Sequence, residues 1–223
     1  MINRSDKWSG KRRRSLEIPI GKSVLFVYCG ECTEPNYFNA ILDDIKTNME
    51  VKSSGITKFN YDYEISAVDP SNMAKQTPKL VSNRKKQYCE VYVVFDKDSF
   101  TSPNFDNAIK SINNLTTDEC EYVALWSNQC IELWFILNFE YLQSKLERID
   151  YFDKIGKYLN IKYEKNVKDI AARIKESGGS WSKAIKYSEK LKDEFMNKPY
   201  SKQFPATNVD YFFKKYSDFI KKY

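Results

Sequence analysis

The stretch that decides the fold is Val24–Phe38, which reads VLFVYCGECTEPNYF. An apolar run stops at Gly30, and apolar residues resume with helical spacing after Pro35. A short apolar run that ends in glycine is typical of a buried strand, and proline suits the first turn of a helix because its missing N–H is not needed there. The pattern predicts a strand over 23–29, a turn that carries Glu31 and Glu34, and a helix over 35–49. Ligands of open α/β sheets bind beyond the carboxyl ends of such strands, so this acidic turn is the first candidate for chemistry.

The residues that follow predict further strands and helices in alternation. The run at 91–95 is rich in β-branched and aromatic residues, which indicates a buried parallel strand that ends at Asp96. We expect other strands at 61–68 and 122–126, and helices at 104–115 and 131–137, the latter behind a Ser or Asn cap, with the last turns of another helix at 81–86. From residue 141 the chain turns to Lys- and Tyr-rich amphipathic patterns, which predict helices at 141–159, 167–177, 181–197 and 208–222.

These patterns favour an α/β fold with a mostly parallel, Rossmann-like sheet flanked by helices and a C-terminal helical extension. The expected organisation is a basic N-terminal arm at 1–20, an α/β domain at 21–140, and a helical extension at 141–223 packed on the core. The length of 223 residues is sufficient for a sizeable core.

Composition excludes several kinds of chemistry. The chain has no histidine, which rules out Ser-His and Cys-His catalysis and histidine-bound metals. Its five cysteines are an odd number, which fits reduced thiols better than a disulfide framework. The polar, basic start of the chain does not resemble a signal peptide, and no apolar run is long enough for a membrane span. We therefore expect a cytoplasmic protein without membrane contact, and oxygen-ligated metal is the leading enzymatic option.

Charge is segregated along the chain, although the net charge is only +6. Residues 1–14 contain six Lys and Arg against one acid, residues 141–223 contain nineteen against eleven, and the middle has an excess of acids. Basic ends around an acidic centre suit a protein that grips a polyanion while central carboxylates hold divalent cations. Solvated lysine-rich helix faces are an equally good explanation of the basic ends.

Acidic residues follow three of the predicted strands. Glu31 and Glu34 follow the first, Asp96 and Asp98 follow the third, and Glu132 follows the fourth. In an extended chain the i, i+2 spacing of the two aspartates directs both carboxylates to one face. Strand ends of a parallel sheet share one edge, so the three groups can converge and hold Mg²⁺ with water and a substrate phosphate. Each of these acidic residues alone can also have a purely structural role, such as capping a loop or placing a favourable charge at the start of a helix.

The cysteines offer two alternative kinds of site, a redox pair and a zinc site. Cys29 and Cys32 form a C-x-x-C between a strand and a helix, where a redox pair could lie with a thiol pKa lowered by the helix. The strand-ending aspartates have no role in thiol exchange, so this alternative is weaker. A zinc site would need two of the scattered cysteines to join this pair.

Four segments together resemble the RloB-like family of prokaryotic phage-defence proteins, which are built on a Toprim-type fold. They are Tyr28–Phe38, Phe95–Phe100, Ser127–Trp134 and Pro205–Val209. The first is similar to the family's Cys-Glu-Gly-Glu-Lys-Thr-Glu-Pro-Asn-Tyr-Phe, the second to its Asp-x-Asp strand end, the third to Ser-Asn-Pro-x-Phe-Glu-Leu-Trp, and the last to Pro-Ser-Thr-x-Val. The resemblance implies a metal-dependent nuclease in which Asp96 and Asp98 hold Mg²⁺ or Mn²⁺, while Glu34 and Glu132 complete the site.

One position departs from that pattern. The glutamate that the family has just before the turn glycine is Cys29 here, and a thiol is a poor ligand for Mg²⁺. Either Glu31 or Glu34 takes over its part, or catalysis is weakened or lost.

Two functional hypotheses follow. The first is a Toprim-type metal-dependent nuclease that hydrolyses phosphodiester bonds of DNA or RNA as a phage-defence effector, with catalytic residues Glu31, Glu34 and Glu132 and metal ligands Glu34, Asp96 and Asp98. The second is a catalytically impaired Toprim-like module that binds nucleic acid or a partner protein without cutting. Expected partners are nucleic acid, an ATPase encoded in the same operon, as the resemblance suggests, and a second copy of the chain in a homodimer.

Overall fold

The computed structural model describes residues 21–55 and 57–220, so the expected basic arm at 1–20 lies outside the described residues. Five strands form one sheet in the order β2-β1-β3-β4-β5. The first four are parallel, and β5 runs antiparallel to β4. The predicted mostly parallel α/β sheet is confirmed. The strands are β1 (Lys22–Tyr28), β2 (Phe59–Ile65), β3 (Glu90–Asp96), β4 (Glu121–Asn128) and β5 (Ala206–Thr207).

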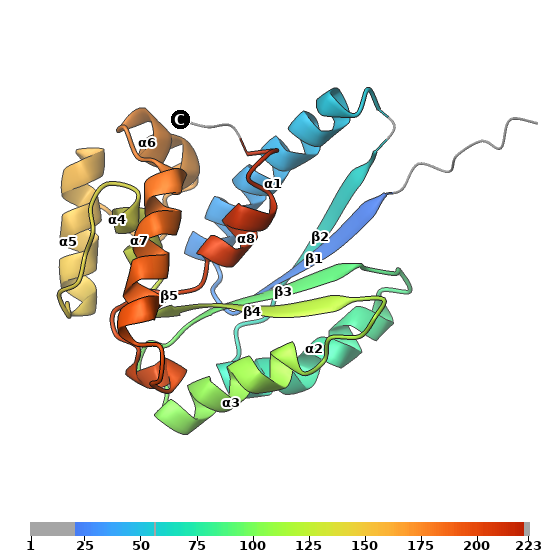
Figure 1. The fold of residues 1–223 in the computed structure, drawn as a ribbon, viewed down its shortest axis with the longest axis horizontal. Coiled ribbons are helices and arrows are strands. Elements are labelled where there is room, and N and C mark those ends of the chain that lie inside the picture. Colours follow the sequence, from blue (N-terminus) through green and yellow to red (C-terminus); the bar gives the residue numbers. More distant parts are fainter. Residues whose placement is uncertain (1–20, 56, 221–223) are drawn as a thin grey trace, which may run out of the picture.

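Helices cover both faces of this sheet, as Figure 1 shows. On one face lie α2 (Pro70–Asn83) and α3 (Ser102–Asn113), which pack against each other. The other face carries the long α1 and the C-terminal helices. These are α1 (Thr33–Lys52), α4 (Glu132–Leu137), α5 (Arg148–Leu159), α6 (Ile170–Glu176), α7 (Trp181–Glu194) and α8 (Asp210–Lys215), with a short 3₁₀ turn at Tyr200–Lys202.

The order of the strands creates a switch point between β1 and β3. From β1 the chain moves to one side to form β2, and then returns past β1 to form β3 on the other side. The connections after β1 and β3 therefore leave the sheet toward opposite faces, α1 to one and α3 to the other. A crevice forms at the carboxyl ends of strands where the order reverses in this way.

The core has one layer on each side of the sheet because side chains of a strand alternate between faces. Phe26 stacks on Tyr92 with ring centroids 4.9 Å apart, and Phe212 of α8 meets Phe26 edge-on at 5.2 Å. Leu25 and Val27 point to the opposite face and pack among the residues of α2 and α3. Helix α8 thus contributes to the same core as β1 and β3.

The C-terminal part also supplies the edge of the sheet, which the sequence patterns did not indicate. Residues Ala206 and Thr207 pair with Asn128 and Ser127 of β4. Asn208 continues the pairing with its side chain: Oδ1 accepts from the Trp126 N–H at 2.7 Å, and Nδ2 donates to the Ala124 carbonyl at 2.7 Å. The helix predicted at 208–222 is therefore shorter, and among the described residues only Asp210–Lys215 are α-helical there.

Two other predicted boundaries and one predicted cap are wrong, each for a local reason. The strand predicted at 61–68 is Phe59–Ile65, because a turn follows in which Val68 N–H donates to the Ser66 carbonyl at 2.7 Å. The helix predicted at 141–159 starts only at Arg148, where Asp150 accepts from the Glu147 N–H at 3.1 Å and fixes the first turn. Helix α4 has no Ser or Asn cap, because those residues remain extended in β4.

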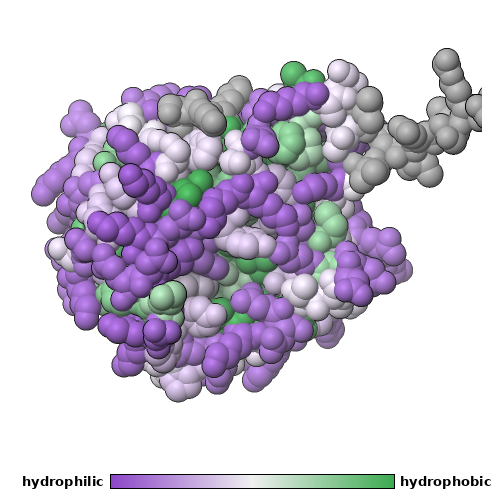
Figure 2. Space-filling view, viewed as in Figure 1, coloured by the Kyte–Doolittle hydropathy of each residue, from purple (hydrophilic) through white to green (hydrophobic). Residues whose placement is uncertain are grey.

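Figure 2 shows a mostly hydrophilic face on which the apolar areas are small and separate. Among the described residues, none of the helices combines the length and the apolar character that crossing a membrane requires.

Candidate metal and phosphate site

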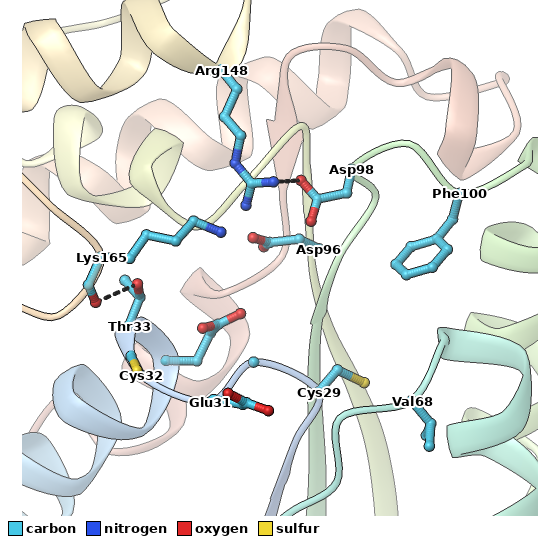
Figure 3. A pocket seen from close by; sticks show the side chains of 12 residues that line it. Cys29, Glu31, Cys32, Thr33, Val68, Asp96, Asp98, Phe100, Arg148 and Lys165 are labelled. Carbon is cyan, nitrogen blue, oxygen red and sulfur yellow. Dashed lines mark hydrogen bonds and ion pairs between the residues drawn. The ribbon is translucent and has the colours of Figure 1, made fainter.

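A pocket of about 330 Å³ lies at the switch point, beyond the carboxyl ends of β1 and β3. The turn after β1 forms one wall, and the turn after β3 forms another. Two basic side chains from the C-terminal part, Arg148 and Lys165, complete the lining, as Figure 3 shows. The pocket lies where the acidic turns of the sequence were expected to meet.

The segment between β1 and α1 brings Glu34 to the pocket. Glu34 lies in the first turn of α1 and is only 7 % exposed. Its carboxylate rests directly on Gly30, where a Cβ atom would come within 2.1 Å of the Glu34 Oε2. The glycine of the turn is therefore needed so that Glu34 can fold back over it. Burial, together with the negative charges of Glu132 and Asp98, raises the pKa of Glu34 to about 7.

Asp96 is the last residue of β3 and lies deep in the pocket. Burial is the largest cause that raises its pKa well above the ordinary value, and the charges of Glu34, Glu132 and Asp98 act in the same direction. The N–H of Ile131 donates to Asp96 and partly offsets this effect. Mutual repulsion among buried carboxylates is relieved when a cation binds between them.

Asp98 reaches the same pocket by a route that the sequence did not predict. The chain leaves β3 at Asp96, and Asp98 has a φ of 43°, so the extended geometry assumed for the two aspartates is wrong. The turn is fixed by β4 and its loop: Lys97 N–H donates to the Ser127 carbonyl at 2.8 Å, and Asp98 N–H donates to the Gln129 carbonyl at 3.1 Å. Asp98 forms an ion pair with Arg148 at 2.5 Å.

Glu132 is fully buried at the start of α4. Its Oε1 accepts a hydrogen bond from the Tyr163 hydroxyl at 3.0 Å, and its Oε2 is buried with no hydrogen-bond partner. A buried carboxylate oxygen without a donor is costly in free energy unless a cation or another donor reaches it. Glu132 does not line the pocket itself, although its charge contributes to the raised pKa values of Glu34 and Asp96.

Residues of the C-terminal part lie in this site, and sequence reasoning missed them. Thr33 Oγ1 donates to the Lys165 carbonyl at 3.0 Å, and Asn36 Nδ2 donates to the Val167 carbonyl at 3.4 Å. These bonds hold the loop after α5 against the start of α1, and Lys165 then points into the pocket. Sequence spacing carries no signal for this contact because 132 residues separate the two partners.

Glu31, Cys29 and Cys32 line the pocket without joining the acidic cluster. Glu31 is exposed, and Figure 3 shows it apart from Asp96 and Asp98. The Cys29 thiol points toward Val68 and away from the aspartates. Burial, followed by the charges of Glu34 and Asp96, raises its pKa, whereas a redox thiol needs a lowered one. Both cysteines are free thiols. The raised pKa of Cys29 contradicts the lowered thiol pKa that was expected at this turn.

The carboxylates suit Mg²⁺ in its usual manner of binding, but they do not enclose an ion alone. Across residues 21–55 and 57–220, no three acidic or thiol side chains are arranged to ligate a single metal ion. Mg²⁺ is commonly held by one or two carboxylates together with water and substrate phosphate. Such a cation would neutralise the charge of Asp96, whose pKa is raised by burial and by neighbouring carboxylates. It would also neutralise the charge on Glu132 Oε2, which has no hydrogen-bond partner.

The family model described as "RloB-like protein" matches residues 24–215, which is most of the chain. The chain belongs to the RloB-like family. Searches of curated proteins and of solved structures gave no match. The matched range of this RloB-like chain contains Glu34, Asp96, Asp98 and Glu132, together with both basic residues of the pocket.

Proposed function

We propose that this RloB-like protein is a Toprim-type, metal-dependent nuclease that hydrolyses phosphodiester bonds of nucleic acid and acts as a phage-defence effector. The observation that carries the proposal is the cluster of carboxylates at the switch point, two of which have raised pKa values. Such a cluster is unfavourable in an apo protein and becomes favourable when it binds a divalent cation. The family resemblance supports the defence role and an ATPase partner.

Asp96, Asp98 and Glu34 are the proposed ligands of Mg²⁺ or Mn²⁺, with one or two of them bound directly and the rest of the coordination supplied by water and substrate phosphate. When bound, the ion supplies Lewis-acid stabilisation of a phosphoryl oxygen and lowers the pKa of water. Asp98 is held by Arg148, so this ion pair would have to open for Asp98 to hold the cation. Glu132 lies behind the first ligands, where Tyr163 fixes the orientation of its carboxylate through Oε1.

Glu34 is the proposed proton carrier of the site. A carboxyl group with a pKa of about 7 exchanges protons readily near neutral pH, which suits a general acid or base. Its place against Gly30 limits the positions that its carboxylate can take. Glu31 is exposed at the rim of the pocket, where it is accessible to a substrate rather than to the buried acids.

The second candidate is a Toprim-like module that binds nucleic acid without cutting it. Cys29 favours this candidate, because its thiol faces away from the acidic cluster and contributes no charge to the metal. Glu34 is the acid nearest in sequence that is buried with the cluster, and it takes the place of the missing carboxylate in the first candidate.

Cleavage assays separate the two candidates. Purified protein is incubated with DNA, RNA and tRNA in Mg²⁺, Mn²⁺ or EDTA, beside the Asp96→Ala/Asp98→Ala variant. We expect metal-dependent cleavage that the double variant loses. Intact substrates, or equal cleavage by the variant, would exclude the nuclease. A large gain on Cys29→Glu in an otherwise weak enzyme would show that only one carboxylate is missing.

A further inference from the structure

Two basic side chains share the pocket with the acidic cluster, and the sequence patterns predicted neither of them there. Arg148 is the first residue of α5, and Lys165 lies in the loop between α5 and α6. Both side chains point into the pocket in Figure 3. Basic residues are not needed to hold Mg²⁺, so their presence requires a separate explanation.

Arg148 has donors to spare. A guanidinium carries five N–H donors in a planar fork, and one terminal nitrogen of Arg148 is engaged with Asp98. Its Nε is buried and has no hydrogen-bond partner. The side chain is held in place from the other side, because the guanidinium lies 5.9 Å from the ring centroid of Phe152. A partly buried arginine with unused donors beside a cavity is suited to a tetrahedral oxyanion.

Lys165 is fixed by its main chain rather than by its side chain. Thr33 holds its carbonyl, so the backbone of the loop is anchored while the ammonium extends into the pocket. Its charge acts on Glu34, whose pKa it lowers in part. Arg148 and Lys165 thus approach the acids from the C-terminal part of the chain, whereas the acids lie at the ends of the strands and the starts of α1 and α4.

We propose that Arg148 and Lys165 are the phosphate-binding pair of this pocket and that Arg148 exchanges its ion pair with Asp98 for a phosphate of the substrate. The inference rests on the proposed function and names the group that the pocket recognises. Before substrate binds, Asp98 keeps Arg148 occupied. If Asp98 held a metal ion instead, the guanidinium would be free to bind the phosphate. Binding of the cation would then favour binding of the substrate phosphate.

The exchange makes an unusual prediction for a variant that loses an acid. Asp98→Asn should bind phosphate more tightly in EDTA, because Arg148 is free, even though it should not cut. The probe is a short fluorescein-labelled single-stranded DNA, with an RNA of the same sequence, in a fluorescence anisotropy titration without metal. We expect about threefold tighter binding for Asp98→Asn and about tenfold weaker binding for Arg148→Ala and for Lys165→Ala. Each weakened variant should also lose about one unit of the slope of log K against log salt concentration.

The double variant Asp98→Asn/Arg148→Ala decides whether Arg148 has a role beyond neutralising Asp98. If Arg148 binds phosphate, the double variant binds about tenfold more weakly than Asp98→Asn. Equal affinity of the two would overturn the proposal. Arg148→Lys keeps the charge but loses the fork, so it should recover only part of the affinity and covers the case in which Arg148→Ala fails to fold. Arg173→Ala is the matched control, since Arg173 forms a solvent-exposed ion pair with Asp169 at 2.8 Å and does not line the pocket.

The outcomes distinguish this inference from the nuclease proposal. If wild type cuts nothing with any metal but Arg148→Ala still weakens binding of the probe in EDTA, the phosphate pair stands and the nuclease fails. If wild type cuts while Arg148→Ala and Lys165→Ala bind as tightly as wild type, the phosphate pair fails and the nuclease stands.

Discussion

Glu34 and Glu90 are two buried glutamates at opposite ends of the sheet, with pKa shifts of opposite sign. Glu34 lies among other carboxylates. Glu90, the first residue of β3, is surrounded by donors: the hydroxyls of Tyr92 and Tyr216 each donate to it at 2.7 Å, and Lys215 lies at 3.1 Å. The carboxylate of Glu34 is therefore repelled by its neighbours in the pocket, whereas the carboxylate of Glu90 is attracted by the hydroxyls and the lysine around it.

Replacing Glu34 with glutamine should stabilise the metal-free fold in mildly alkaline solution. A pKa of about 7 in the folded protein, above the ordinary 4.5, means that ionisation of Glu34 opposes folding. The stabilising effect of its proton is complete below about pH 4.5 and is lost as the pH rises through about 7. We expect Glu34→Gln to exceed wild type by on the order of 2 kcal/mol at pH 8 in urea unfolding with EDTA, and to match it near pH 4.5. Exposed Glu31→Gln is the control, and a Glu34→Gln that is less stable than wild type at pH 8 would contradict the argument.

Replacing Glu90 with glutamine should have the reverse effect. Burial alone would raise the pKa of Glu90, but hydrogen bonds from Tyr216 and Tyr92 and the charge of Lys215 lower it below 4.5. Its charge therefore stabilises the fold above that value, and the stabilisation is lost as the pH falls through the lowered pKa. Glu90→Gln should lose about 2 kcal/mol of unfolding free energy at pH 7, with a difference that narrows below pH 4.5. An equal loss at both pH values would show that lost packing, and not charge, is responsible.

Gly30→Ala should displace Glu34 without removing it. The added methyl group would lie 2.1 Å from Glu34 Oε2, so the carboxylate must leave its position. We expect the variant to fold, by circular dichroism, and to lose most of the rise in melting temperature that Mg²⁺ gives wild type. Gly21→Ala is the matched control, since its Cβ would have only an ordinary contact of 3.5 Å. A full Mg²⁺ response in Gly30→Ala would remove Glu34 from the metal site.

The sequence patterns predicted acidic residues at this pocket but not the basic residues Arg148 and Lys165. The acids predicted to converge because they follow strands were Glu31, Glu34, Asp96, Asp98 and Glu132. All except Glu132 line one pocket, and Glu31 is exposed there. The reason given for the two aspartates was wrong, since a left-handed residue rather than an extended chain carries Asp98 there. Arg148 and Lys165 were not predictable, because a basic residue in a lysine-rich segment looks the same whether it faces solvent or a pocket.

Strands and long helices were predictable to within a few residues wherever buried positions gave the sequence a clear spacing of apolar residues. The fully buried β3 and the apolar stripe of α1 are examples. The two-residue β5 was not, because Ala206 and Thr207 are too few to show any alternation. The late start of α5 coincides with a capping box in which the Glu147 N–H donates to Asp150, and hydrophobic spacing does not report such a cap.

Asn208 is one of the side chains that attach the β5 segment to β4, beside Thr207. Replacing it with alanine leaves the Trp126 N–H and the Ala124 carbonyl of β4 without their partners. We expect Asn208→Ala to lose about 2 kcal/mol in urea unfolding. Asn197→Ala, in an exposed turn, should be close to neutral. A neutral Asn208→Ala would mean that water replaces both bonds, and that β5 is held by its own main-chain pairs with β4.

As a whole molecule, the chain folds around one core that needs both of its parts. Phe212 of α8 contacts Phe26, Phe38 and Tyr92, with ring centroids 5.2 to 5.9 Å apart. A chain that ends at residue 140 would keep α1 on this face of the sheet but would expose to water the part that α8 covers. We expect such a truncation to be unfolded or aggregated, with no cooperative melting transition by circular dichroism, whereas residues 21–220 melt cooperatively. A cooperative, monomeric 21–140 fragment would show that the C-terminal helices are an accessory.

The bond between Thr33 and the Lys165 carbonyl has a consequence for the order of events during synthesis. At about 5–20 residues per second, a ribosome needs roughly ten seconds to make the 132 residues that separate the two partners. During that time the acidic turns exist without Arg148 and Lys165. A nascent chain of this kind therefore has no complete pocket until translation has passed the loop after α5, whatever ligand the finished pocket binds.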